Sequence, residues 1–156
     1  MRTSKPSNER LLDHVGIAVP SIDDAIPTWA ALVGRPATGR ETLADQGVEV
    51  VFIGSGPGRI ELLTPTRADS PVARFLEHRG PGLHHLCYRV ADIQAALAEC
   101  RAAGFELIDE RPREGAHGHR VAFVHPRSTG GVLIEFLERA DAEDAGRGSA
   151  KPSPSP

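Results

Sequence analysis

The stretch LDHVGIAV at residues 12–19 recurs later in the chain, with substitutions, as LHHLCYRV at residues 83–90. Two further segments repeat in the same order: VVFI and IELL in the first half become VAFV and IEFL in the second, at residues 50–53, 60–63, 121–124 and 134–137. Each half therefore places one histidine near its start and one glutamate near its end, inside apolar runs typical of strands. This repeat predicts two similar modules that carry the same chemistry.

The segments between the repeated stretches predict a β-α-β-β-β order in each half. Strands are expected at residues 12–19, 38–43, 47–54 and 59–64, and again at 83–90, 105–109, 119–125 and 131–138. The first helix follows a cap at Ser21 or Asp23 and ends at Gly34, and the second runs from near Asp92 to Gly104. A shorter helix is expected at residues 71–78, between the halves. The predicted fold class is α+β, with two paired βαβββ modules.

The chain of 156 residues suits one domain or two small modules that pack together, since one module alone buries only a marginal core. Residues 1–10 are predicted to form a flexible leader. Residues 139–156, which are charged and then rich in proline and serine, are predicted to form a disordered tail. The domain then covers residues 11–138, with module one at about 11–66, a linker at 67–81 and module two at about 82–138.

Charge and hydropathy exclude several classes of protein. The net charge is −3, with lysine and arginine scattered among acids, which does not favour nucleic acid or an anionic membrane as a partner. No segment approaches the roughly 18 consecutive apolar residues of a membrane span, and residues 1–10 lack the apolar core of a secretion signal. Cys87 and Cys100 lack zinc-type spacing, so we interpret them as reduced packing residues. These features predict a cytoplasmic protein.

The repeated histidines and glutamates form a candidate metal site. His14 and His85 occupy equivalent positions and face the same way in their modules, whereas strand alternation turns His84 away from His85, so His84 is predicted to pack. Glu61 and Glu135 lie mid-strand among aliphatic residues, where a carboxylate is costly to bury unless it is paired or bound to a cation. A divalent ion shared by His14, Glu61, His85 and Glu135 explains the whole set.

This donor set favours some metals over others. Mixed nitrogen and oxygen ligands suit Co²⁺, Mn²⁺, Zn²⁺, Ni²⁺ or Fe²⁺ rather than Ca²⁺. A single strand histidine is more often a core residue, and a single mid-strand glutamate often faces solvent. The joint recurrence of both residue types therefore carries the prediction.

Motifs inside and outside the repeat resemble a known family. The segments that carry the resemblance are DHVGIAV, QGV, ELLTP, GLHHL, HPR and GGVLIE, at residues 13–19, 46–48, 61–65, 82–86, 125–127 and 130–135. Together they resemble the vicinal oxygen chelate superfamily (glyoxalase/bleomycin resistance/dioxygenase), and within it the methylmalonyl-CoA epimerase family, over nearly all of residues 11–138. The first segment alone would indicate only the superfamily, whereas the last is more typical of the epimerases.

The resemblance implies a fold, a ligand set and a reaction. Its modules curl their mixed sheets into an open cup around a metal ion, with His14, Glu61, His85 and Glu135 as ligands and Co²⁺ as the first choice of ion. Family members usually form homodimers and interconvert the 2R and 2S forms of methylmalonyl-CoA, so an acyl-CoA is the expected small-molecule partner. The proton α to the thioester is removed to give an enolate, whose charge the ion stabilises.

Inversion needs a base on one face of the substrate and an acid on the other, and the sequence leaves this pair partly open. In well-studied bacterial relatives a glutamate, proposed as one acid/base, lies three residues after the glycine of the QGV element, where this chain has Val50. Some family members lack that glutamate, so Val50 does not exclude epimerisation. Glu49 points to the opposite sheet face unless a bulge shifts the register. The resemblance implies Glu135 as one acid/base as well as a ligand. Glu61 is the symmetric candidate for the second, and Glu49 stays open if a bulge shifts the register.

The segment GAHGHR at residues 115–120 is predicted to form a loop over the acyl-CoA, in which Arg120 or His119 binds a carboxylate or phosphate. An ordinary exposed connection is the alternative. Two other functions also stay open. One is a divergent enzyme of the superfamily: an Fe-dependent dioxygenase, a glyoxalase-type isomerase or a natural-product enzyme. The other is a non-catalytic small-molecule binding protein, which Val50 mildly favours and the intact histidine and glutamate set opposes.

Overall fold

The computed structural model describes residues 10–140, so nearly all of the predicted leader and tail lies outside the described residues. The strands are β1 (Leu11–Ala18), β2 (Ala37–Leu43), β3 (Val48–Ile53), β4 (Arg59–Pro65), β5 (Gly82–Arg89), β6 (Arg113–Glu114), β7 (Arg120–Val124) and β8 (Ile134–Glu138). The helices are α1 (Ile22–Val33), α2 (Pro71–Arg79) and α3 (Ile93–Ala102), with short 3₁₀ turns at Ala44–Gln46, Ala116–Gly118 and Pro126–Ser128. The division into leader, domain and tail stays a prediction.

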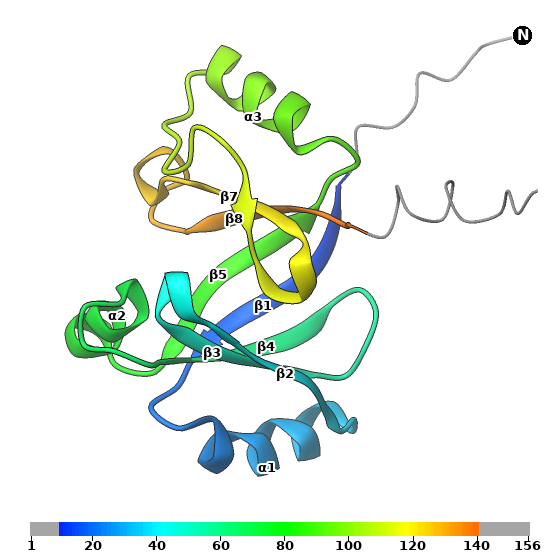
Figure 1. Cartoon of the computed structure of the whole chain (residues 1–156), viewed down its shortest axis with the longest axis vertical. Coiled ribbons are helices and arrows are strands. Elements are labelled where there is room, and N and C mark those ends of the chain that lie inside the picture. Colours follow the sequence, from blue (N-terminus) through cyan, green and yellow to red (C-terminus); the bar gives the residue numbers. More distant parts are fainter. Residues whose placement is uncertain (1–9, 141–156) are drawn as a thin grey trace, which may run out of the picture.

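The eight strands form one mixed sheet that mirrors the sequence repeat. Their order is β2-β3-β4-β1-β5-β8-β7-β6. The first strands of the two modules, β1 and β5, pair antiparallel at the centre, and each has the last strand of its own module parallel on its other side. Figure 1 shows β1 and β5 running together through the middle, with α1 and β2–β4 below and α3, β7 and β8 above. The predicted α+β fold of two paired modules in a curled mixed sheet is confirmed.

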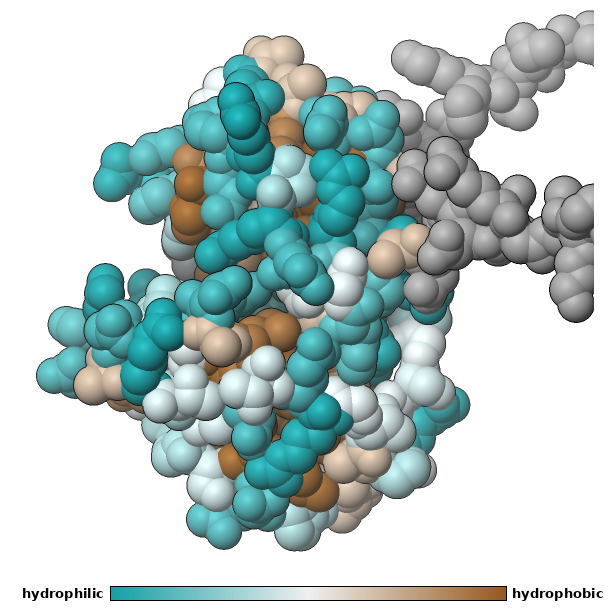
Figure 2. Space-filling model, viewed as in Figure 1, coloured by the Kyte–Doolittle hydropathy of each residue, from teal (hydrophilic) through white to brown (hydrophobic). Residues whose placement is uncertain are grey.

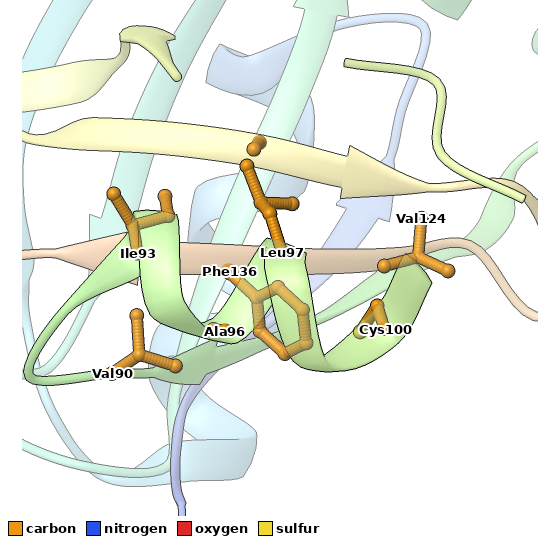
Figure 3. Close-up of a cluster of buried hydrophobic side chains, with 8 residues drawn as sticks. Val90, Ile93, Ala96, Leu97, Cys100, Val124 and Phe136 are labelled. Carbon is orange, nitrogen blue, oxygen red and sulfur yellow. The ribbon is translucent and has the colours of Figure 1, made fainter. Parts of the chain in front are cut away.

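Each module packs its long helix against one face of its own half of the sheet. In module two, Ile93, Leu97 and Cys100 of α3 lie against Val124 and Phe136 (Figure 3). The matching cluster of module one joins α1 to β1, β3 and β4 through Ile22, Ile17, Val51, Ile53 and Leu62. Burial of each large aliphatic side chain contributes about 1.5–3 kcal/mol, and helices this short depend on such packing. Because side chains alternate along strands, the opposite face is free for polar residues.

The helix boundaries follow the capping signals in the sequence. Ser21, rather than Asp23, caps α1, since its hydroxyl accepts the N–H of Asp24 at 3.2 Å. Asp92 caps α3 by accepting the N–H of Ala95 at 3.0 Å. Gly34 ends α1 in the left-handed region with φ of 72°. Within residues 10–140, no helix is long and apolar enough to cross a membrane.

Two predicted strands of module two differ from the structure. Residues 105–109 form no regular strand, although Leu107 makes one isolated bridge with Val124. The carboxylate of Asp109 accepts the N–H of Phe123 at 2.8 Å, so a side chain replaces a backbone acceptor in the ladder. The outer strand is instead the two-residue β6. The strand predicted from residue 131 begins at Ile134, because Gly131 adopts a turn conformation with φ of 104°.

Candidate functional site

The four repeated polar side chains converge where β1 and β5 meet, on the sheet face opposite α1 and α3. His14 on β1, His85 on β5, Glu61 on β4 and Glu135 on β8 are all buried. One ligand atom from each lies within 4.8 Å of the others. Because β4 and β8 flank the central pair on opposite sides, one carboxylate comes from each side of the site. The predicted set of side chains is therefore brought together.

The Nε2 atom of each histidine and the Oε2 atom of each glutamate face the centre of the cluster. The Nε2 atom of His14 lies 3.1 Å from Oε2 of Glu61 and 3.4 Å from Oε2 of Glu135. The Nε2 atom of His85 lies 3.3 Å and 2.9 Å from the same two oxygens. The two Nε2 atoms are 3.2 Å apart. Two imidazole nitrogens and two carboxylate oxygens around one point suit a divalent ion of the first transition series or Zn²⁺.

The pKa shifts of the four side chains indicate a site that favours two positive charges. Burial lowers the pKa of His85, but hydrogen bonding and the charges of Glu135 and Glu61 outweigh it and raise this pKa to about 9. Burial also opposes the raised pKa of His14, which the charge of Glu61 holds well above its usual range. Despite burial, His14 lowers the pKa of both glutamates. Two imidazolium protons therefore balance two carboxylates, as one M²⁺ ion would.

Binding of a divalent ion is expected to release about two protons near neutral pH, because the ion replaces the protons on His14 and His85. Since the pKa of His85 is raised to about 9 and that of His14 is raised further, affinity should increase as the pH rises through the neutral range. Calorimetric titration with Co²⁺ in buffers of different protonation enthalpy counts these protons. A binding enthalpy independent of the buffer would contradict the expectation.

Gly16 provides the space that the His85 ring occupies. The two residues pair across β1 and β5, and a Cβ atom on Gly16 would lie 2.2 Å from Cε1 of His85. The equivalent neighbour of His14 in the other module is Cys87, which is buried and pairs with His14 across the strands. Small residues thus stand opposite both histidines.

Gly16→Ala is expected to weaken Co²⁺ binding by about 10-fold or more, because the added methyl group displaces the His85 ring. Cys87→Ala is the matched control, since it removes volume at the equivalent position and should leave the affinity within about threefold. Metal titration and circular dichroism of both variants check affinity and fold. Equal affinity in wild type and Gly16→Ala would show that the ring does not need this space.

Of the cavities that adjoin the cluster, two share part of their lining. The smaller cavity, of about 30 Å³, is lined by the four polar side chains and by apolar residues that include Val50, Leu63 and Val121. The larger, of about 220 Å³, shares Gln46, Val48, Leu63, His85 and Phe123 with it. Its remaining lining is apolar with some charged residues, namely Asp45, Arg67, Pro71, Val72, His84, Ile108, Arg113 and Leu133. Figure 2 shows hydrophobic surface between the upper and lower halves of an otherwise mostly hydrophilic face.

The predicted substrate contacts fall in different places. His119 is buried, lines the smaller cavity, and accepts the N–H of Ala140 on its Nδ1 atom at 3.1 Å. Arg120 lies next to it on β7 but lines a separate groove beside α3, with its guanidinium 3.5 Å from Glu138. The backbone of His119 is extended just before β7, so consecutive side chains point to opposite faces, which explains the separation. The structure brings His119 to the site and Arg120 away from it, and both roles stay predictions.

The position next to Val50 does not supply a carboxylate to the cavity. Val50 is fully buried and lines the smaller cavity. Glu49 instead lies 2.7 Å from the guanidinium of Arg40. The pairing of β3 with β4 runs without a register shift from Val48 to Ile53. No bulge in this ladder therefore turns Glu49 toward the site.

A loop of module two reaches across to module one and borders the cavity. The N–H of His117 donates to Glu41 at 2.7 Å, and Gln46 donates to the carbonyl of Glu114 at 3.2 Å. The His117 ring also contacts Phe52, with ring centroids 5.5 Å apart. His117 has φ of 57°, which is uncommon for a residue other than glycine. The sequence predicted a loop here, but not its contacts with module one.

Comparisons with known proteins agree with this geometry. Residues 13–123 match the model of the Glyoxalase/Bleomycin resistance protein/Dioxygenase superfamily. The mitochondrial methylmalonyl-CoA epimerase of Homo sapiens is 39% identical over 83% of this chain and 73% of its own length. The ethylmalonyl-CoA/methylmalonyl-CoA epimerase of Cereibacter sphaeroides is 40% identical over 80% of this chain and 95% of its own.

A solved structure extends the likeness to three dimensions. A methylmalonyl-CoA epimerase in complex with methylmalonyl-CoA superposes with a TM-score of 0.80 at 33% identity, over 84% of this chain and 95% of that one. Its fold is the curled sheet of paired modules described above. The family match and the buried histidine and glutamate cluster together suggest a divalent metal site. The chain belongs to the Glyoxalase/Bleomycin resistance protein/Dioxygenase superfamily.

Proposed function

We propose that this protein is a metal-dependent epimerase that interconverts (2R)- and (2S)-methylmalonyl-CoA. The observation that carries the proposal is the buried cluster in which Glu61 and Glu135 approach from opposite sides, with His14 and His85 between them. Relatives with this fold and substantial identity are named methylmalonyl-CoA epimerases, and one of them is solved with methylmalonyl-CoA. The working unit is the predicted domain at residues 11–138.

The reacting carbon of the substrate carries a proton made acidic by a neighbouring thioester and carboxylate. His14, Glu61, His85 and Glu135 would hold a divalent ion, which would supply Lewis-acid stabilisation of the negative charge that develops on the substrate. Glu135 takes the proton from one face with a carboxylate oxygen. For the proton count to balance, Glu61, on the strand at the other side of the central pair, starts the cycle protonated and delivers its proton to the opposite face. This leaves Glu61 ionised and Glu135 protonated, which is the starting state of the reverse reaction.

The walls of the site favour this proton transfer. The apolar side chains of Val50, Leu63 and Val121 line the smaller cavity. Electrostatic interactions are stronger beside apolar walls than in bulk water. The loop that carries His117 borders the same cavity and is held to module one by Glu41. A substrate-derived anion formed there is shielded from protonation by bulk solvent.

The larger cavity suits the arm of the acyl-CoA that leads away from the thioester. Its apolar walls include Val72, Ile108 and Leu133, and its arginines, Arg67 and Arg113, complement an anionic ligand. His119 borders the reacting end and is proposed to hydrogen-bond the acyl group. Arg120 lies outside the cavity, so we assign it to the CoA phosphates, which are far from the reacting carbon.

Three finer features belong to the same proposal. Co²⁺ is the proposed ion, since a mixed nitrogen and oxygen set accepts it and it is a Lewis acid without a required redox role. The proposed assembly is a homodimer, in line with the family resemblance. The proposed compartment is the cytoplasm, in line with two cysteines that are free and buried.

The acid/base assignment predicts the effect of moving a carboxylate within the site. Glu61→Gln should lower epimerisation by about 10²-fold or more, because an amide delivers no proton, while metal binding is retained. The family resemblance allows glutamine or glutamate at this position, and well-studied bacterial relatives carry a glutamate where this chain has Val50. The double variant Glu61→Gln with Val50→Glu is therefore expected to regain part of the activity. Kinetics of the single and double variants at saturating Co²⁺ test this, and full activity in Glu61→Gln alone would exclude Glu61 as the second acid.

The reaction itself is tested by coupling. The Co²⁺-loaded protein is incubated with (2R)-methylmalonyl-CoA, and a stereospecific enzyme that consumes only the 2S form reports its appearance. The proposal predicts product formation that depends on both the protein and the ion. If no 2S form accumulates above the protein-free control, the epimerase assignment is wrong. Oxygen consumption by the Fe²⁺-loaded protein with the same substrate would then favour a dioxygenase.

A further inference from the structure

Each metal-site histidine follows directly after a residue at which the central strand pair slips out of register. Leu12 pairs with Tyr88 and His14 with Cys87, so Asp13 is the extra residue of a bulge in β1. Gly16 pairs with His85 and Ile17 with Leu83, so His84 is the extra residue of a bulge in β5. Asp13 and His84 are also equivalent in the sequence repeat. The two modules thus carry the same irregularity at the same place.

The bulges bring together neighbours that a regular strand would separate. Successive side chains on a regular strand point to opposite faces, whereas a bulge re-aims them. Here Oδ2 of Asp13 lies 2.7 Å from Nδ1 of His14. In β5, Nδ1 of His84 lies 3.0 Å from Nδ1 of His85. Both rings are therefore held at Nδ1 while their Nε2 atoms face the cluster.

The two neighbours differ in chemistry. Asp13 is 1% exposed and carries a charge, which Arg89 stabilises by donating from Nη2 at 2.7 Å and from Nε at 3.2 Å. Arg59 adds a second guanidinium at 3.6 Å. His84 instead packs edge-on against the ring of Phe75, with centroids 4.9 Å apart. The His14 ring thus contacts a carboxylate whose charge two arginines balance, whereas the His85 ring contacts a second imidazole.

We propose that Asp13 and His84 are positioning residues that fix the orientation of His14 and His85 for metal binding, and that Asp13 has the larger effect. The inference rests on the metal site of the proposed function. When Nε2 of a histidine binds an ion, its proton resides on Nδ1, and an acceptor there fixes the ring and increases its basicity. A carboxylate accepts such a hydrogen bond about twice as strongly as a neutral group.

The test compares Co²⁺ binding by the full-length wild type, Asp13→Asn, His84→Leu and Arg89→Met, with a competing chelator to measure affinity. Asp13→Asn is expected to weaken binding roughly 10- to 100-fold, and His84→Leu by a smaller factor. Arg89→Met is the matched control, because it removes the ion pair of Asp13 but keeps the contact with His14. It should stay within about threefold of wild type. The visible absorption of bound Co²⁺ should change in Asp13→Asn and not in Arg89→Met.

A merely structural role for Asp13 gives a different pattern. In that case Asp13→Asn and Arg89→Met would lower the thermal stability of the metal-free protein alike and change metal affinity alike, which would overturn the inference. Unchanged affinity in Asp13→Asn, or a larger loss in His84→Leu, would overturn it too while leaving the metal site intact. Failure of the wild type to bind Co²⁺ would overturn the metal site of the proposed function, and the inference with it.

Discussion

Glu135→Gln is expected to reduce the turnover of methylmalonyl-CoA by roughly 10²- to 10⁴-fold, the usual contribution of a positioned acid or base. The Glu135 carboxylate lies 2.9 Å from Nε2 of His85 and 3.4 Å from Nε2 of His14, deep in the site. An amide fills the same volume and still offers one oxygen, but it accepts no proton. The backbone pairing of β8 with β5 and β7 does not depend on this side chain.

The measurement is steady-state kinetics at saturating Co²⁺, with bound metal quantified in the same samples. Glu49→Gln is the matched control, because Glu49 lies in a strand of the same sheet but pairs with Arg40 instead of lining the cavity. We expect the control to keep nearly full activity. Wild-type turnover in Glu135→Gln, or a loss confined to Glu49→Gln, would show that the acid/base assignment is wrong.

His14→Ala is expected to remove bound metal and with it the activity. The His14 ring lies between three buried carboxylates, those of Asp13, Glu61 and Glu135. Loss of a direct ligand should weaken Co²⁺ binding by more than the roughly 100-fold seen for outer partners of metal ligands. Removal of the shared partner also leaves buried charges uncompensated, which should destabilise the metal-free protein by about 3–5 kcal/mol.

Metal content after dialysis and chemical denaturation of the metal-free protein measure these two effects separately. His78→Ala is a suitable control, since His78 is exposed on α2, where its Nδ1 atom lies 2.7 Å from the carbonyl oxygen of Arg74. Should His14→Ala fold and retain a full equivalent of metal, the four-residue site would be excluded. A variant too unstable for this comparison can be replaced by His14→Gln, which keeps a polar side chain at the position.

The sequence predicted the four clustered residues because the repeat and the strand period act together. A repeat aligns His14 with His85 and Glu61 with Glu135, and a period of two then puts each on the face opposite the helix-packed core. The sequence also predicted where the two long helices begin, at Ser21 or Asp23 and near Asp92, since short polar side chains at helix starts accept N–H groups that lack a partner in the helix. The structure selects Ser21 as the cap of α1.

Predictions of side-chain direction from strand alternation fail where the pairing of β1 with β5 is irregular. Regular alternation turns His84 away from His85, yet the bulge in β5 brings their Nδ1 atoms to 3.0 Å. Asp13 was missed for the same reason, because a bulge leaves no signature in residue type. Residues 105–109, after α3, were wrongly predicted as a strand because they include apolar residues. The sequence does not reveal that the Asp109 carboxylate accepts the N–H of Phe123 in place of a backbone carbonyl.

The most direct test of a metal-dependent epimerase is proton NMR of the Co²⁺-free and metal-loaded protein with one epimer of methylmalonyl-CoA in D₂O, using diamagnetic Zn²⁺ where Co²⁺ broadens the signals. A protein-free control measures the slow unaided exchange of the α-proton. The account predicts fast, metal-dependent loss of the α-proton signal together with formation of the other epimer. Exchange without inversion would leave one working base and contradict the pairing of Glu135 with Glu61. Exchange no faster than the control would contradict the epimerase itself.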